Sequence, residues 1–477
     1  MSAMVLLKDI ADYCRRAGLA ESTFGKLAVN DGKFVNRLRG GGRTTESTLD
    51  RVRDFMIANP PPDEPEGQPF ALKPVGPTSP QPTSPQTPSS QTTRPNTAAE
   101  PQQGAQRKNF RFFDNRQKYL LFVNTCSEKW VVAARTSLEL ANLRPKPPAV
   151  RIFDAGVGDG TVLSRVVRSM HHRFPSLPFF VVGKESSLED VRLALDKMPD
   201  RFSEHPATVV VMTNLYYADA PWLMPRSLTA ATSLVWHEVA LEGSTAHEFE
   251  EQITGLQSFL ADNWRTNLSS TGALIYDRPS VLVLYRNDHR FMLDQVIPRR
   301  GGTRADFDLV MASQPYRARA PLEFKAKKVV APLARALGPG GRLLGVHSHG
   351  HDPGQEILEG VWPGENPFIH DRHQLLKATK TELGQHARHL NFNAYSDARS
   401  LFRYEMHALP SEVSESIGTS TLFAAWNAAT YVGQIEDTRL EQAIGDRRYL
   451  DVTREVVQRN NGLWFWDESF VITRKPD

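Results

Sequence analysis

The sequence predicts an α/β protein, with a mainly parallel sheet covered by helices, preceded by a small all-α segment. Three observations predict it. Apolar runs alternate with amphipathic runs from residue 107 onward. A glycine-rich turn joins the first apolar run to a helical pattern. Residues 60–106 hold 13 of the 33 prolines, so they cannot bury enough apolar surface to fold, and we expect a disordered tether there. The chain therefore divides into residues 1–59, 60–106 and 107–477.

Composition narrows the class of protein. A length of 477 residues suggests two or three domains, and 40% hydrophobic with 23% charged residues is typical of a globular chain. The net charge of +3 gives no global reason to expect nucleic-acid binding. Cys14 and Cys126 are too few for a disulfide framework. We expect a cytoplasmic protein without membrane contact, because the N-terminus is unlike a signal peptide and no apolar run approaches about 20 residues.

Residues 1–59 show short helical patterns. Ile10, Tyr13 and Cys14 share one face of the first, with Leu6. A helix near 21–28 and a second near 31–39 follow, and a last helix begins at the capping signal of residues 45–48 and carries Leu49, Val52, Phe55 and Met56 inward. This arrangement resembles the helix-turn-helix of the phage-repressor-like family. The resemblance implies DNA contacts from the second helix of the pair, at Lys33, Asn36, Arg37 and Arg39.

A second interpretation of this head stays open. Lys and Arg total 10 against 7 acidic residues in residues 1–59, a mild excess that any solvated helical face would show. A protein-docking or dimerising bundle fits the same pattern, and a homodimer is compatible with it.

The stretch "IFDAGVGDGT", residues 152–161, is the most informative part of the chain. Asp154 ends an apolar run, and Gly156, Gly158 and Gly160 follow before a helical pattern opens at Thr161. In a parallel sheet such a turn lies at the carboxyl edge, where the ligand crevice forms. A dinucleotide would require G-x-G-x-x-G, and its pyrophosphate would be repelled by the carboxylate. The turn therefore favours a cationic ligand without phosphate.

This acid-x-G-x-G-x-G pattern resembles the first motif of the class I S-adenosylmethionine-dependent methyltransferases. The resemblance implies a Rossmann-like seven-stranded sheet whose last strand is antiparallel, with S-adenosyl-L-methionine bound at Asp154 and the three glycines. It also implies that Glu185, at the end of "PFFVVGKE", binds the ribose hydroxyls, and that Asn214, after "ATVVVMT", lies at the adenine edge. A surface glutamate at a helix start is the alternative for Glu185.

Two segments compete for the fourth strand. Residues 232–243 lie at the expected distance from the glycine turn, but 307–319 are followed in order by a helix, a P-G-G turn and a fifth strand, as in the family. We prefer the later segment. Residues 229–306 then form an insertion, with one helix and a hairpin lying over the substrate crevice. Residues 399–410 and 463–474 are the expected sixth and seventh strands.

The preferred fourth strand ends in Ser313-Gln314-Pro315-Tyr316. Amino-directed methyltransferases resembling this architecture carry Asp, Asn or Ser, then Pro-Pro, then an aromatic residue. Ser313 and Tyr316 fit that order, whereas Gln314 replaces a proline, and a plain turn around Pro315 is the alternative. The resemblance implies methyl transfer to an amine, or to a hydroxyl or thiol.

Seven of the 14 histidines fall between residues 347 and 389. In "HSHGHD" (347–352), His347 and His349 share a strand face, and we expect His347 to line the substrate pocket as a group that takes a proton near neutral pH. With His351 and Asp352 the segment also suggests a zinc-dependent hydrolase. We expect no metal, because a sulfonium leaving group is already activated.

A DNA-binding regulator with a non-catalytic, ligand-sensing body is the other alternative for the function of the whole chain.

Overall fold

The computed structural model describes residues 21–29, 31–39, 116–268, 274–407, 418–445 and 447–476, together with the single residues 7, 10, 13, 14, 48, 51, 52, 55 and 56. The chain forms two compact units, Met1–Pro101 and Gln102–Asp477, and each has its own core. The tether predicted over 60–106 lies outside the described residues, as do Leu6 and Leu49. Within the described part, no helix is long and apolar enough to cross a membrane.

In the smaller unit, the predicted helix pair is confirmed as α2 (Glu21–Val29) and α3 (Phe34–Arg39). A Cβ on Gly25 would lie 2.5 Å from the carbonyl oxygen of Asp31, so a glycine lets the connection fold back on α2. Both helices pack on side chains from flanking segments in a cluster that holds Ile10, Tyr13, Cys14, Phe24, Ala28, Phe34, Val35, Leu38 and Val52.

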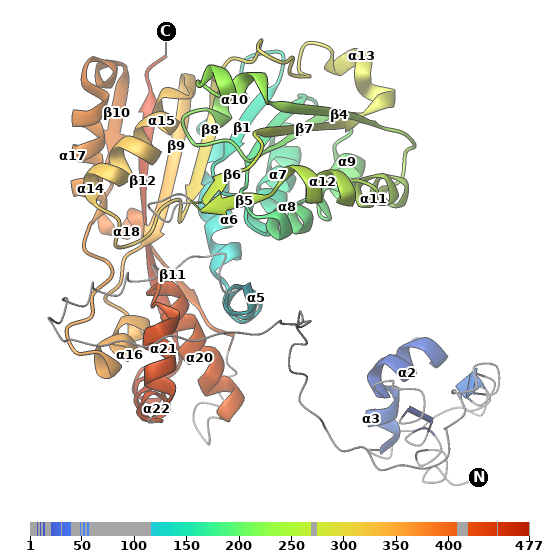
Figure 1. Ribbon diagram of the computed structural model, residues 1–477, viewed down its shortest axis with the longest axis vertical. Coiled ribbons are helices and arrows are strands. Elements are labelled where there is room, and N and C mark those ends of the chain that lie inside the picture. Colours follow the sequence, from blue (N-terminus) through green and yellow to red (C-terminus); the bar gives the residue numbers. More distant parts are fainter. Residues whose placement is uncertain are drawn as a thin grey trace, which may run out of the picture. The chain divides into compact units, whose positions relative to one another are not determined.

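The larger unit contains a ten-stranded sheet in the order β10-β12-β9-β8-β1-β2-β3-β7-β4, with β11 paired to β12 (Figure 1). Its central strands β3, β2, β1, β8 and β9 are parallel, which confirms the predicted parallel sheet. These parallel strands are β1 (Val150–Asp154), β2 (Phe179–Lys184), β3 (Thr208–Thr213), β8 (Phe307–Ser313) and β9 (Leu337–Ser348). The antiparallel strands β10 (Leu390–Asn393), β11 (Leu401–Glu405) and β12 (Trp464–Arg474) follow at one side.

The choice of the fourth strand and the direction of the last strand are both confirmed. β8 pairs directly with β1, so the later of the two competing segments is the fourth strand. β12 runs antiparallel to β9 and to β10. The expected sixth strand is corrected in part: β11 pairs with the first half of β12, and β10, some ten residues earlier in the chain, occupies the outer position beside its second half.

The prediction for the insertion is corrected in its hairpin. β7 (Ser280–Arg286) pairs antiparallel with β3, and β4 (Val235–Leu241) pairs parallel with β7, so these two strands of the insertion extend the sheet. The expected hairpin is absent from the described residues, since β6 (Leu274–Tyr276) pairs with β5 (Thr266–Leu268) in a separate small sheet. All seven residues of β7 are buried, so both of its faces are covered, and β3 and β4 supply partners for the backbone N–H and C=O groups that would otherwise be buried unpaired on its two edges.

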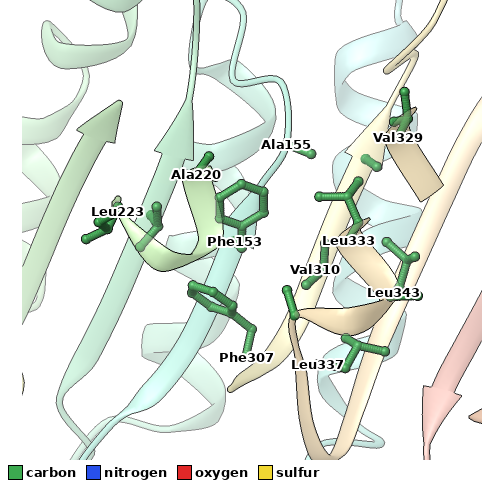
Figure 2. Packing of buried hydrophobic residues seen from close by; sticks show 14 of the residues in the cluster. Phe153, Ala155, Ala220, Leu223, Phe307, Val310, Val329, Leu333, Leu337 and Leu343 are labelled. Atoms are coloured by element: carbon green, nitrogen blue, oxygen red, sulfur yellow. The ribbon is translucent and has the colours of Figure 1, made fainter. Parts of the chain in front are cut away.

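Two helical layers cover the sheet. One face carries α6 (Glu128–Leu140), α7 (Thr161–Arg173), α8 (Leu188–Leu195), α9 (Met198–Glu204), α11 (Ala246–Thr254) and α12 (Gln257–Asn263). The other carries η1 (Ala220–Trp222), the π-helical η3 (Lys325–Val330), α15 (Ala331–Arg335) and α17 (Arg372–Leu383). Figure 2 shows part of this second core, a buried cluster that includes Phe153 of β1, Phe307 of β8, Leu333 and Leu343. The ring centres of Phe153 and Phe307 are 5.4 Å apart.

A third group of helices gathers at one end of the sheet, beyond the strand end where β9 leads into α16 (Figure 1). It comprises α5 (Arg116–Thr125), α16 (Pro353–Val361), α20 (Thr419–Val432), α21 (Asp437–Ile444) and α22 (Arg448–Arg459). Trp426 and Tyr431 are buried in its core. The group therefore lies over the carboxyl edge of the parallel strands. The remaining helical elements are α10 (Leu228–Thr232), η2 (Asn287–His289), α13 (Arg290–Leu293), α14 (Leu322–Phe324), η4 (Gly384–His389) and α18 (Asp397–Ser400).

Candidate active site

The glycine-rich turn lies between β1 and α7, at the carboxyl edge of the sheet. Gly158 and Gly160 have φ angles of 55° and 79°, in the left-handed region that favours glycine. A Cβ on Gly160 would lie 2.6 Å from the Cα of Ala194, so this glycine lets the turn approach α8. A Cβ on Gly156 would meet only the carbonyl oxygen of Ser313, at 4.0 Å. Gly156 therefore presents bare backbone to open space.

Asp154 ends β1 beside this open backbone. Its side chain is buried, and Oδ1 accepts a hydrogen bond from the N–H of Gly156 at 3.2 Å. Burial raises the pKa of Asp154 to about 7, against the opposing effect of that hydrogen bond. The carboxylate is thus incompletely stabilised by the protein, and a cationic ligand group beside it would favour its charged form.

Glu185 follows β2 directly and joins that strand to the glycine turn. Its Oε2 accepts from the N–H of Gly158 at 2.8 Å, and its Oε1 accepts from the N–H groups of Ser186 and Ser187 at 2.7 and 2.9 Å. A carboxylate offers about four acceptor positions, so one remains for a ligand hydroxyl. The predicted acid is therefore fixed in place next to the predicted glycines.

Asn214 is placed differently. Its amide donates to the carbonyl oxygens of Asn263 and Arg278, at 3.1 and 2.8 Å, and its Oδ1 accepts from the N–H of Ser280 at 2.8 Å. All three partners belong to the insertion. Both hydrogens of the Asn214 amide are engaged in these bonds, which hold the insertion against the end of β3. The amide therefore has no donor left for an adenine edge.

Tyr119 completes the turn from outside the predicted set. The hydroxyl of this α5 residue accepts from the N–H of Asp159 at 3.1 Å and is 3.4 Å from the Oδ1 of the same residue. It would also lie 3.0 Å from a Cβ on Gly158, so a side chain there would displace it. Tyr119 therefore fixes α5 over the glycine turn. No local pattern in the sequence shows which helix covers a turn some 40 residues later.

A small hollow opens beside Gly156, and we call it the aspartate hollow. Lys129 of α6, Asp154, Gly156 and Ser313 line it together with apolar side chains. The ammonium of Lys129 lies 3.4 Å from the carboxylate of Glu128. Burial lowers the pKa of Lys129, but Glu128 and neighbouring groups more than reverse this, so the ammonium stays charged. Ser313 Oγ is buried and has no hydrogen-bond partner. The hollow thus offers a cation, an anion and a free hydroxyl.

The backbone is strained directly after Ser313. Gln314 has a φ of 48°, a conformation that non-glycine residues rarely adopt and that is common at functional sites. Its Nε2 donates to the Oγ of Ser348 and to the Oδ1 of Asp467, both at 3.1 Å, which holds the strand end in place. The carbonyl of Pro315 accepts from the hydroxyl of Tyr217 at 2.9 Å, which ties the strand end to the segment after β3.

Tyr316 and His347 meet in a second small hollow, away from Ser313. Tyr316 Oη and His347 Nδ1 are 2.9 Å apart, and His347 Nε2 is 2.8 Å from Glu468 Oε2. Burial raises the pKa of Tyr316 well above its ordinary value, so the phenol keeps its proton. Burial also acts to raise the pKa of Glu468, but hydrogen bonds from His347 and Arg372 lower it to about 2. A buried Tyr-His-Glu chain results.

The other histidines of "HSHGHD" do not extend this chain into a metal site. His349 Nδ1 lies 4.0 Å from Glu468, which agrees with the expected common face of His347 and His349. Gly350 then takes a φ of 79° and His351 one of 57°, so the strand ends there. Within the described part of the chain, no group of three His, Cys, Asp or Glu side chains is arranged to hold a metal ion.

The four residues predicted to contact DNA lie on or just before α3. Lys33, Asn36, Arg37 and Arg39 are exposed. Arg37 pairs with Asp31 at 2.6 Å, and Arg39 pairs with Glu21 of α2 at 2.7 Å. The Arg39 pair links α3 to α2, whereas the Arg37 pair links α3 to the turn before it, and DNA binding by this unit stays a prediction.

The strand order defines the class of fold. Counting along the chain and leaving out the insertion, the first five strands lie in the order 3-2-1-4-5, as in doubly wound nucleotide-binding proteins, but a reversed last strand lies between the fifth strand and the outer one. The larger unit is therefore Rossmann-like, and it fits the fold of class I S-adenosylmethionine-dependent methyltransferases.

Comparison with known proteins gives loose similarities to the same class. No family model matches the chain, and no curated protein matches it. Among solved structures, it is similar to geranyl diphosphate methyltransferase bound to sinefungin (13% identity, 72% of this chain and 78% of that one, TM-score 0.27). It is also similar to the plantazolicin methyltransferase BpumL with SAH, at 10% identity over 76% of this chain and 91% of that one, with a TM-score of 0.27. A further similar structure is phosphoethanolamine N-methyltransferase 2 of Haemonchus contortus, at 10% identity over 72% of this chain and 53% of that one, with a TM-score of 0.23. Because these TM-scores are low, the assignment of the fold class rests on the strand order alone.

Proposed function

We propose that the protein is an S-adenosyl-L-methionine-dependent methyltransferase acting on an amine. One observation carries the proposal: at the carboxyl edge, the acid-glycine turn after β1 and the unpartnered hydroxyl of Ser313 at the end of β8 face the same hollow. The carboxyl edge where the strand order reverses is where doubly wound sheets bind ligands. The chemistry of this hollow suits a charged ligand without phosphate.

The residues of the aspartate hollow fit the amino-acid half of that cofactor. Asp154 would receive the ammonium group, because its buried carboxylate lines the hollow beside the open backbone of Gly156. Lys129 would receive the carboxylate, as its ammonium lines the same hollow and stays charged. Gly156 leaves its backbone open to close approach. Glu185 would bind the ribose hydroxyls through its remaining acceptor position.

When bound, the cofactor supplies a methyl group on a positively charged sulfur. The protein's part is then to align the acceptor nitrogen with the methyl group and to exclude water from both. Ser313 Oγ would accept a hydrogen bond from the N–H of the acceptor, and the lone pair of that nitrogen would then point toward the hollow. The strained Gln314 fixes the position of Ser313, since its amide joins β8 to β9 and β12.

Calorimetric titration of the full chain with S-adenosylmethionine and S-adenosylhomocysteine tests the proposal. We expect both compounds to bind, and Asp154→Asn to weaken both. Asp308→Asn is the matched control: Asp308 also has a pKa raised by burial, to about 6, but it lies at the opposite end of β8. If neither compound binds the wild-type protein, the proposal is wrong.

A further inference from the structure

The second hollow contains a buried cation that the proposed function does not use. Tyr316, Lys325, His347, Phe368 and His370 line it, and we call it the lysine hollow. Lys325 is 2% exposed. Its ammonium donates to the carbonyl oxygen of Ala318 at 2.7 Å and lies 3.4 Å from Nδ1 of His370.

Lys325 lacks the acidic partner that a buried ammonium normally has. Lys129, also in the larger unit, lies 3.4 Å from a carboxylate and keeps its charge. In the described part of the chain, no carboxylate forms an ion pair with Lys325, and burial alone lowers its pKa to about 8. Leaving a buried charge without a counterion costs several kcal/mol. A cation held in this state beside a hollow is suited to an anion that enters the hollow.

The backbone places Lys325 inward. It is the first residue of the π-helical η3, while Lys327 and Lys328 of the same element are exposed. π-Helical turns are rare and often occur at functional sites, because they alter the direction of side chains. The ammonium also lies 5.1 Å from the centre of the Tyr316 ring, and the negative face of an aromatic ring attracts a cation.

No Asp or Glu is among the described residues that line the lysine hollow. Phe368 is apolar, and His347 is already bonded to Tyr316 and Glu468. His370 offers a ring nitrogen near the ammonium. The nearest carboxylate in the chain of hydrogen bonds, Glu468, is separated from the hollow by His347 and is paired with Arg372 at 2.6 Å. It therefore does not neutralise Lys325.

We propose that the lysine hollow binds the carboxylate or phosphate group of a small molecule through Lys325. Resting on the proposed function, the molecule is the methyl acceptor: Tyr316 lies three residues beyond Ser313, so an anionic end held here lies on the same strand end as the hydroxyl that would hold the amine. The acceptor class is then an amine that carries an acidic group.

Titration with acetate and with inorganic phosphate, each at fixed ionic strength, tests this site in the full chain. We expect at least one anion to bind, and the stronger of the two to identify the acidic group. Lys325→Met should weaken that binding about tenfold or more, as expected for a lost charged hydrogen bond. Lys327→Met, an exposed lysine two residues away, is the matched control and should bind as the wild type does. Binding of neither anion to the wild type, or equal binding to Lys325→Met, would overturn the proposal.

The two proposals fail separately. Lys325→Met should retain S-adenosylhomocysteine binding, which also shows that the variant is folded, and Asp154→Asn should retain anion binding. Anion binding without S-adenosylhomocysteine binding would leave the lysine hollow as an anion site and remove the methyl acceptor as its ligand. Loss of both ligands in Lys325→Met with an unchanged melting temperature would contradict two separate sites.

Discussion

Replacing Asp154 by Asn should make the unliganded protein more stable while making it bind the cofactor less well. The Asn side chain can keep the hydrogen bond from the N–H of Gly156 through Oδ1. What it removes is a carboxylate that is 3% exposed and whose pKa is raised from 3.8 to about 7. A pKa raised by burial means that the folded state holds the proton more tightly than the unfolded state, so ionisation of this group costs stability.

The size and pH dependence of the effect follow from that shift. Below the unfolded pKa the group is neutral in both states and costs nothing; as pH rises through the interval up to about 7, the cost grows, and above it the cost is complete. About three pKa units correspond to an upper bound of about 4 kcal/mol in the free energy of unfolding. At about pH 5.5 only about 2 kcal/mol of this would be present. Asp154→Asn should therefore gain more at high pH than at low pH.

Urea denaturation of wild type and variant at about pH 5.5 and about pH 8.5 measures both values. The control Asp308→Asn should also gain stability with rising pH, because burial raises the pKa of Asp308 to about 6, but it should leave S-adenosylhomocysteine binding unchanged. Equal gains in the free energy of unfolding at the two pH values, or no gain, would refute the reasoning that burial makes ionisation of Asp154 costly. A gain in stability with unchanged cofactor binding would show that Asp154 does not bind the cofactor.

Four further predictions follow from the same geometry. Glu185→Gln places an amide N–H₂ against backbone N–H groups, so it should lower the free energy of unfolding by about 1–3 kcal/mol and weaken S-adenosylhomocysteine binding; unchanged calorimetric affinity contradicts the ribose role. Lys129→Met leaves Glu128 buried without its cation and should cost about 3 kcal/mol with loss of cofactor affinity, and a stable variant with normal affinity argues against it. Tyr316→Phe should lower stability by about 1–2 kcal/mol through the lost bond to His347, measured by thermal unfolding; no change would mean that the bond contributes nothing. Deletion of residues 1–59 should leave cofactor affinity unchanged but abolish gel retardation of duplex DNA, and a full chain that never retards DNA contradicts the helix-turn-helix expectation.

Local patterns in the sequence were enough to predict the glycine-rich turn after β1. Asp154 and the three glycines are adjacent in the chain, and their conformations depend mostly on their own φ angles and on the first neighbouring strand. Glu185 could be predicted for a similar reason, because the ends of consecutive parallel strands meet at one edge. The parallel sheet was predicted from the alternation of apolar and amphipathic runs, whereas the fourth strand and the reversed last strand were predicted from the resemblance to the methyltransferase family.

Residues far apart in the chain decided the rest. Tyr119 reaches the site because α5 lies over the carboxyl edge, and Lys129 reaches it because α6 packs on one face of the sheet. No pattern in the sequence shows that packing. The buried backbone of β7 is paired on both edges, by β3 and β4, which alternation along the chain alone does not show. Asn214 bonds to Asn263, Arg278 and Ser280, partners that come from far along the chain.

The sequence by itself determined the glycine-rich turn and the alternation that forms a parallel sheet, because both depend on residue type and on spacing along the chain, while the resemblance to a known family supplied the fourth and last strands. Only the tertiary structure decided that Ser313 lies in the aspartate hollow while Tyr316 and His347 lie in another, and that Lys325 is buried without an acidic partner. These facts depend on which side chains share a space and how far water is excluded from it, and burial and pairing of charges are properties of the packed molecule.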